Sequence, residues 1–183
     1  MNQFNKALQK ASQNPKAVLV LAASWSDQLR FASVKSDTSG EFERVDDNQK
    51  GYNAVLTKIK KLQTMIDKSH KLIVFGAVPG AKNMKAPLDA LLRPDYFSSV
   101  SQNVSSFPSK EGYGFEINKF FAAHLPELAG LYYLSPYDAL CQNDNCYSLI
   151  DDKIIYSDGL HLSLDGSVLV IQYFEKKILE ILQ

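Results

Sequence analysis

Lys71-Leu-Ile-Val-Phe-Gly-Ala-Val-Pro79 is the stretch of this sequence that decides the fold. Its apolar residues are consecutive rather than alternating, which is typical of a strand buried on both faces of a parallel sheet. The run stops at Pro79-Gly80, a pair that favours a turn. A similar run, Lys16 to Ala23, lies upstream, and Leu131 to Leu134 predicts a third, shorter strand. The chain therefore holds three candidate strands for one buried sheet.

Helical patterns alternate with these strands. Tyr52 to Asp67 places its apolar residues on one face and its lysines on or near the other, which predicts an amphipathic helix. Residues 2–13, Phe115 to His124 and Ser163 to Leu182 also show helical spacing. Alternation of strands and helices favours an α/β fold with a doubly wound parallel sheet.

Polar segments fill the space between these elements. Residues 32–50 predict a surface loop with room for a short hairpin. Residues 80–112 predict a long irregular insertion, and insertions of this length in compact domains are usually functional or mobile. Ser135 to Asp138 predicts the start of a helical turn.

The ends of the predicted strands carry the residues of chemical interest. In open parallel sheets, ligands bind beyond the carboxyl ends of the strands. Ser24-Trp25, Val78-Pro79, Ser135-Pro136 and Asp158–His161 all lie at or just after such ends. We therefore expect these four segments to converge on one edge of the sheet.

Length and composition fit one globular domain over residues 1–183. Hydrophobic residues make up 45% and charged residues 22%, as in ordinary soluble proteins. Lys+Arg and Asp+Glu number 20 each, so we expect no nucleic-acid partner and no attraction to anionic membranes. The longest apolar run, Ala17 to Ala23, is far shorter than the roughly 20 residues that span a bilayer. The polar N-terminus is not a signal peptide, so we expect export only as part of a longer membrane-bound parent.

The sharpest candidate for catalysis is the pair Asp158 and His161, which are three residues apart on a polar loop before the last helix. The carboxylate can hold one imidazole nitrogen while the other takes a proton from a serine hydroxyl. Two other readings remain open. His161 can instead hydrogen-bond a backbone carbonyl. Ser157-Asp158-Gly159 also favours a turn in its own right, and Ser163 is a candidate N-cap of the last helix.

Ser24 and Trp25 follow the first predicted strand. Trp25, the only tryptophan, is either the wall of a substrate pocket or a core side chain that caps the sheet. Ser24 is a weak candidate nucleophile because it lacks the flanking glycines of a strained strand-to-helix turn. Gly76-x-x-x-Gly80 lacks the Lys and Ser/Thr of a phosphate-binding loop, and we expect no cofactor.

Cys141 and Cys146 enclose four residues rich in Asn and Asp, which predict a tight turn. The pair can close a small disulfide loop in an oxidising compartment, or it can remain as two thiols in a cytosolic loop. A zinc site is disfavoured because His70 and His124 lie in other segments and the sequence has no second cysteine pair.

The last third of the sequence contains Ser135-Pro-Tyr-Asp-Ala-Leu-Cys141, Cys146 and Ile155-Tyr-Ser-Asp-Gly-Leu-His-Leu-Ser-Leu-Asp-Gly166. This run resembles the SGNH hydrolases, the GDSL-type esterases and acyltransferases. It is most similar to the SGNH domain fused behind the acyltransferase-3 membrane domain of bacterial lipopolysaccharide and peptidoglycan O-acetyltransferases. Val18 to Ser26 and Ile73 to Pro79 resemble two further segments of that domain. The resemblance covers most of the chain from about residue 16 onward.

The resemblance implies a flavodoxin-like, three-layer sheet and a function for the candidate residues. Asp158 and His161 would serve a catalytic serine, and Ser24 and Trp25 would line the substrate pocket near the oxyanion site. The extracytoplasmic location of the family implies a Cys141–Cys146 disulfide. It also implies a cell-envelope glycan as substrate and a membrane acyltransferase domain as acyl supplier.

One feature departs from the family pattern. The family's nucleophile lies in a Gly-Asp-Ser motif after the first strand, but this sequence contains no Gly-Asp-Ser, and only 15 residues precede Lys16. The chain thus resembles the last two-thirds of such a domain without its first strand. We expect a nucleophile outside the recognised part and weak activity of this chain alone. A non-catalytic glycan-binding or scaffold module, and use of Ser24 or another internal serine, are the alternatives.

Overall fold

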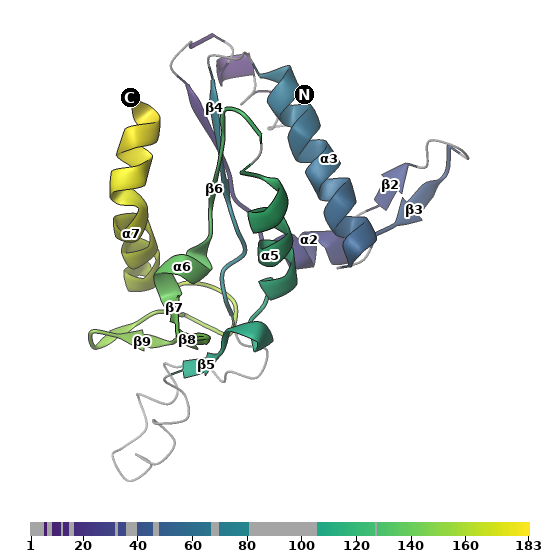
Figure 1. The fold of residues 1–183 in the computed structure, drawn as a ribbon. Helices are drawn as coiled ribbons and strands as arrows, with labels where there is room; N and C mark the ends of the chain where they lie inside the picture. Colours follow the sequence, from purple (N-terminus) through teal and green to yellow (C-terminus); the bar gives the residue numbers. More distant parts are fainter. Residues whose placement is uncertain are drawn as a thin grey trace. The chain divides into compact units, whose positions relative to one another are not determined.

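A computed structural model describes residues 6, 9–11, 13–14, 17–31, 33–35, 40–45, 48–66, 70–80, 106–126 and 128–183. The chain forms two compact units. The first contains Met1–Gly76 and Ile117–Leu134 together with Leu182, and the second contains Ala77–Glu116 and Ser135–Ile181 together with Gln183. The ribbon in Figure 1 shows the elements of each.

The first unit is built on a parallel sheet. Its strands are β1 (Val18–Leu21), β4 (Lys71–Phe75) and β6 (Leu131–Leu134), in the order β1-β4-β6. Val18 pairs with Lys71, and Leu72 pairs with Leu131, both in parallel register. Helix α3 (Gln49–Met65) separates β1 from β4 along the chain, and α5 (Phe115–His124) separates β4 from β6. The predicted α/β class with a parallel sheet is confirmed.

The three strands differ in burial. In the central strand β4, Leu72, Ile73 and Val74 are at most 2% exposed, as the continuous apolar run predicts. In β1, at the edge of the described sheet, Val20 is 59% exposed. The prediction that both faces of this run are buried is therefore wrong at Val20, because solvent reaches one face of the strand there.

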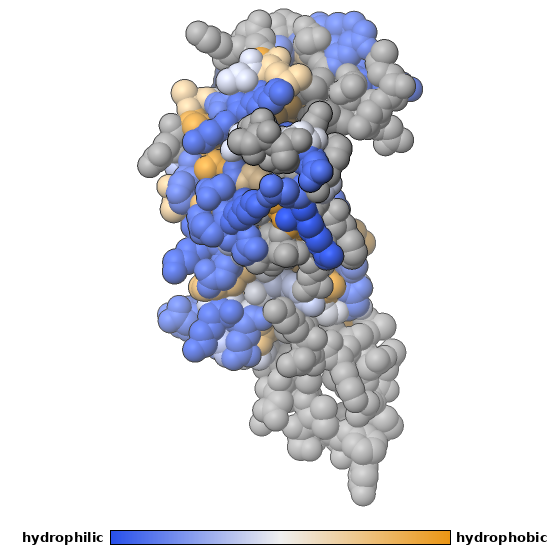
Figure 2. Space-filling view, turned by 90° about the vertical axis from the view of Figure 1, so that its right-hand side faces the viewer, coloured by the Kyte–Doolittle hydropathy of each residue, from blue (hydrophilic) through white to orange (hydrophobic). Residues whose placement is uncertain are grey.

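Helix α3 follows its predicted pattern. The Asn48 side-chain oxygen accepts a hydrogen bond from the Gly51 N–H at 3.1 Å and so caps the N-terminus. The buried face packs against α5 through the rings of Tyr52 and Phe120, whose centroids are 5.6 Å apart. The opposite face remains in solvent, and hydrophilic residues cover most of the coloured surface in Figure 2.

Three elements of the first unit, one helix and the two strands of a hairpin, lie between β1 and α3. The predicted hairpin in the 32–50 loop is present as the antiparallel strands β2 (Ser33–Lys35) and β3 (Phe42–Arg44). A seven-residue helix, α2 (Trp25–Phe31), precedes it and was not predicted. The helix expected over residues 2–13 lies largely outside the described residues.

The second unit contains a small antiparallel sheet and the last helix. Strands β5 (Ser106–Pro108), β8 (Asn145–Tyr147) and β7 (Cys141–Gln142) pair in the order β5-β8-β7. The second unit also contains η2 (Ser109–Glu111), α6 (Pro136–Leu140), β9 (Leu149–Ile150), β10 (Lys153–Ile154) and α7 (Leu164–Leu182). Residues 81–105, most of the predicted insertion, lie outside the described residues.

The turn between β7 and β8 explains the cysteine spacing. Asn143 and Asp144 have φ angles of 50° and 62°, the left-handed conformation that two-residue hairpin turns require. Asn and Asp tolerate that conformation better than most residues. The turn places Cys141 directly opposite Cys146 in the ladder, and the two form a disulfide.

Candidate active site

The loop that carries Asp158 and His161 is closed at its base by backbone contacts in the second unit. Tyr156 and Leu162 form an isolated antiparallel bridge. The Ser157 N–H donates to the His161 carbonyl oxygen at 2.9 Å, and the Ser157 hydroxyl donates to the same oxygen at 3.2 Å. These contacts fix the ends of the loop, so that its polar side chains start from a defined backbone.

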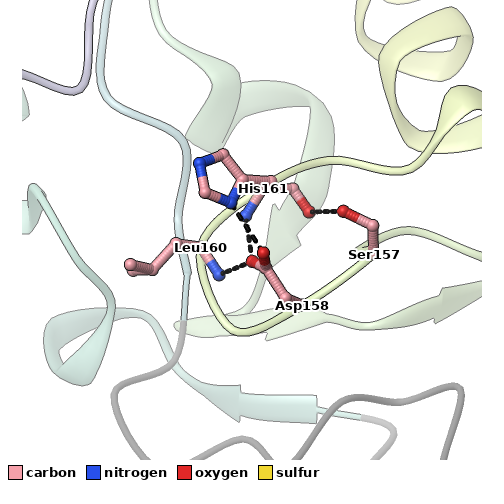
Figure 3. Close-up of polar contacts among 4 residues, drawn as sticks. All are labelled: Ser157, Asp158, Leu160 and His161. Carbon is pink, nitrogen blue, oxygen red and sulfur yellow. Dashed lines mark hydrogen bonds and ion pairs between the residues drawn. The ribbon is translucent and has the colours of Figure 1, made fainter.

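Within the loop, the Asp158 carboxylate makes three hydrogen bonds (Figure 3). Its Oδ1 accepts from the N–H groups of Leu160 and His161, each at 2.7 Å. Its Oδ2 lies 2.7 Å from Nδ1 of the His161 imidazole. The turn and the acid–base pair therefore exist together, and the imidazole contacts a carboxylate rather than a backbone carbonyl.

These contacts keep Asp158 ionised. The Leu160 N–H, followed by the His161 side chain and the His161 N–H, lowers the pKa of Asp158 from 3.8 to about 2. Because Nδ1 of His161 faces an anionic oxygen, we assign the imidazole proton to Nδ1. Nε2 then carries a free lone pair. The His161 side chain is 75% exposed, so this nitrogen is open to a reacting group.

The Tyr156 side chain, at the base of the loop, packs into the core of the second unit. It is fully buried, and its ring centroid lies 6.3 Å from that of Phe107 on β5. Burial raises the pKa of the Tyr156 phenol far above its usual range, so it does not titrate under ordinary conditions. The Tyr156 phenol therefore stays neutral, and the charge of the loop is that of the ionised Asp158 carboxylate.

The structure places Trp25 in the core of the first unit. Its side chain is 6% exposed, and its indole N–H donates to the Phe75 carbonyl oxygen at 2.8 Å. The ring meets Phe121 edge-on at 5.2 Å. The prediction of a core side chain that caps the sheet is confirmed. Trp25 also borders an apolar cavity of about 510 Å³ beside α2 and α3, and a role in substrate binding stays a prediction.

Ser24 is exposed at the start of α2. Its carbonyl oxygen accepts the Gln28 N–H at 2.9 Å, which makes it the first hydrogen-bonded residue of that helix. This position is a short coil before a helix, not a glycine-flanked strained turn. Its role as pocket residue or nucleophile stays a prediction.

A match over almost the entire sequence shows the family of the chain. The family profile described as "SGNH domain (fused to AT3 domains)" matches residues 1–176. This chain belongs to the SGNH domain family. The Asp-x-x-His loop of this SGNH domain, the Cys141–Cys146 disulfide and the parallel sheet thus occur together in a member of that family.

A solved structure shares the fold of this SGNH domain. The periplasmic domain of a lipopolysaccharide acetyltransferase from Salmonella ser. Paratyphi A superposes with a TM-score of 0.60 at 21% identity, over 96% of this chain. The match covers 61% of the Salmonella structure. A candidate platelet activating factor from Streptococcus pneumoniae gives a TM-score of 0.45 at 10% identity, over 95% of each chain. No curated protein matches the sequence.

The predicted site residues fall in both units of the SGNH domain. Ser24 and Trp25 belong to the first, and Asp158 and His161 belong to the second, so convergence of all the strand-end segments stays a prediction. Within the second unit, Gly80, which directly follows the strand-end segment Val78-Pro79, lies against the backbone of Gly159. Sequence reasoning treated Gly80 only as the end of a strand.

The described residues contain no group of three or more His, Cys, Asp or Glu side chains arranged to hold a metal ion. None of their helices combines the length and the hydropathy needed to cross a bilayer.

Proposed function

We propose that this SGNH domain is an O-acyltransferase or esterase that acts on acyl esters, most simply acetyl esters, of a bacterial cell-envelope glycan. The observation that carries the proposal is the 2.7 Å contact between Asp158 Oδ2 and His161 Nδ1, with the other imidazole nitrogen exposed. The fusion of the family to acyltransferase-3 domains and the fold shared with a lipopolysaccharide acetyltransferase domain support the substrate class.

In this proposal, His161 is the general base and Asp158 orients it. Nε2 of His161 takes the proton of a serine hydroxyl as its oxygen attacks the acyl carbonyl carbon. The tetrahedral intermediate collapses, the bond to the donor oxygen breaks, and Nε2 returns the proton to that oxygen. The acyl group now esterifies the serine. A glycan hydroxyl, or water in the esterase reaction, repeats the sequence and carries the acyl group away.

The nucleophile in this proposal is a serine outside the recognised motifs, because the sequence contains no Gly-Asp-Ser. Trp25 and Ser24 are proposed to border the acyl-binding side of the site. A membrane acyltransferase domain is proposed to supply the acyl group on the extracytoplasmic side of the membrane. The Cys141–Cys146 disulfide supports that location, since disulfides persist in oxidising compartments.

Fluorophosphonate labelling followed by peptide mass spectrometry tests the proposal. The label reacts only with a serine activated by a base, so in the protein that carries this domain we expect one labelled serine. His161→Ala should abolish the label. His124→Ala is the matched control, because His124 is exposed and bonds the Phe120 carbonyl on α5. Equal labelling of His161→Ala and wild type would refute the role of His161 as base.

The same experiment separates catalysis from binding. A label found within residues 1–183 identifies an internal nucleophile, with Ser24 as the first candidate to substitute. Complete absence of label and of ester hydrolysis, combined with glycan binding that survives His161→Ala, would replace the proposal by the non-catalytic module. Comparison of p-nitrophenyl acetate with longer p-nitrophenyl esters tests the preference for a short acyl group.

A further inference from the structure

Gly80 lies closer to the Asp158–His161 loop than any side chain permits. A Cβ atom at this position would come within 2.4 Å of the Gly159 carbonyl oxygen and 3.0 Å of the Leu160 Cα. Both atoms belong to the backbone, so no change of rotamer relieves the conflict. Glycine at position 80 therefore sets how closely the two segments approach.

The segment that presents Gly80 is itself held in place. The Gly80 carbonyl oxygen accepts the Tyr113 N–H at 2.7 Å, and the Tyr113 carbonyl oxygen accepts the Tyr137 hydroxyl at 2.7 Å. The Tyr137 ring on α6 packs against Phe115, with ring centroids 6.0 Å apart. Gly112 makes room for that hydroxyl, because a Cβ there would lie 2.6 Å from it. Gly80 is thus a support anchored in the packed part of the second unit.

The other side of the loop is fixed equally well. The Ser163 N–H donates to the Ile155 carbonyl oxygen at 2.9 Å. Gly166, in the first turn of α7, packs so tightly that a Cβ would lie 2.1 Å from the same oxygen. The base of the loop is therefore held by α7, and the tip at Gly159 and Leu160 is held by Gly80.

We infer that Gly80 is a positioning residue for His161. The Leu160 and His161 N–H groups hold Oδ1 of Asp158, and the Leu160 backbone is among the atoms nearest to a Cβ at position 80. A displacement of Leu160 moves the donors of the Asp158 carboxylate, and the carboxylate then turns away from Nδ1 of His161. Gly80 acts through the loop and does not contact the reacting atoms.

The inference predicts a defined effect of Gly80→Ala. The methyl group forces the tip of the loop to move by up to about 1 Å, a misplacement that costs about 10²-fold in turnover. The effect on turnover rests on the proposed function of His161, whereas the displacement of the loop does not. We expect kcat to fall about 100-fold with KM within about threefold, because the base and not the substrate is misplaced.

Nuclear magnetic resonance measures the local state of the loop, which a general loss of stability does not change selectively. In the wild type, we expect a hydrogen-bonded Nδ1–H signal of His161 and slow exchange of the Leu160 and His161 amides. In Gly80→Ala, the Nδ1–H signal should disappear and the two amides should exchange at least about tenfold faster. Unchanged signals together with unchanged kcat would overturn the inference.

Gly76→Ala is the matched control. Its Cβ would come equally close, 2.4 Å from the Asn118 Oδ1 in the first unit, but the atoms that it meets belong to the side chains of Asn118 and Tyr133 and not to the loop. We expect this variant to lose thermal stability and to keep the His161 signals. Loss of the signals in both variants would make the effect one of stability and overturn the inference.

A second variant decides the matter if Gly80→Ala does not fold. Tyr137→Phe removes only the hydroxyl that holds the Tyr113 carbonyl, and it should speed exchange at Leu160 and His161 while the rest of the unit stays protected. Unchanged exchange there would overturn the inference. The two proposals fail separately: His161→Ala with full activity refutes the catalytic role, whereas a normal loop in Gly80→Ala or Tyr137→Phe refutes the positioning role.

Discussion

Asp158→Asn separates catalysis from stability in this domain. The carboxylate accepts two backbone N–H groups through Oδ1 and faces Nδ1 of His161 through Oδ2. An asparagine oxygen can keep the two backbone hydrogen bonds. Its NH₂ group, however, points at Nδ1, where two donors cannot meet. The imidazole must then move its proton to Nε2, the nitrogen that has to be unprotonated to act as a base.

The magnitudes of the two effects differ widely. Loss of the correct tautomer in an Asp–His pair lowers kcat by about 10⁴-fold. That factor corresponds to about 5.4 kcal/mol in the activation barrier. The Asp158 side chain is 52% exposed and keeps two of its three hydrogen bonds, so we expect a loss of less than about 1 kcal/mol in stability. The variant should be folded and nearly inactive.

The assay is hydrolysis of p-nitrophenyl acetate by the protein that carries this domain, with the thermal midpoint followed by circular dichroism. Asp165→Asn is the control, because Asp165 is an exposed acid in the first turn of α7, outside the loop that holds the imidazole. Activity of Asp158→Asn within about threefold of the wild type, at an unchanged midpoint, would refute the reasoning.

Three further predictions concern the two units. A carboxyl group whose pKa is lower in the folded state stabilises the fold at pH values above its pKa in the unfolded state. The contribution of Asp158 to the free energy of unfolding should therefore be complete above about pH 4 and lost as the pH falls towards 2. A carboxyl ¹³C titration midpoint near 3.8 contradicts this. Cys146→Ala should destabilise the second unit by about 2 kcal/mol, from the entropy of the small loop that the bond to Cys141 closes; an unchanged denaturant midpoint argues against it. Trp25→Phe should cost about 1–2 kcal/mol, since it leaves the Phe75 carbonyl without its indole donor. A urea titration followed by circular dichroism measures that loss, and a midpoint equal to that of the wild type rules it out.

Local patterns predicted the large elements because their signal lies within the element itself. The apolar run of β4 and the helical spacing of α3, α5 and α7 need no knowledge of distant residues. The antiparallel sheet β5-β8-β7 escaped prediction because its strands have only two or three residues. Left-handed Asn143 and Asp144 and a covalent bond set its register, not an alternating pattern.

For the candidate site too, contacts within one loop could be predicted from the sequence and contacts between distant residues could not. Asp158 and His161 are three residues apart, so the contact between them is a property of one loop and follows from its sequence. The position of Trp25 depends on the carbonyl of Phe75, which is 50 residues away. The local sequence therefore could not decide between a core side chain and a pocket wall. Gly80 was missed because its importance is set by the backbone of Gly159, which no local pattern reveals.

In the proposed mechanism, the geometry of the loop allows the base and the nucleophile to be encoded far apart. All three hydrogen bonds of the Asp158 carboxylate come from residues 160 and 161. The supports of the loop, Gly80 and the first turn of α7, belong to the same compact unit. The contact between Asp158 and His161 is therefore made within this unit and needs no serine. A serine supplied from another segment needs only to reach Nε2 of His161, and its position does not determine whether the base is ready to act.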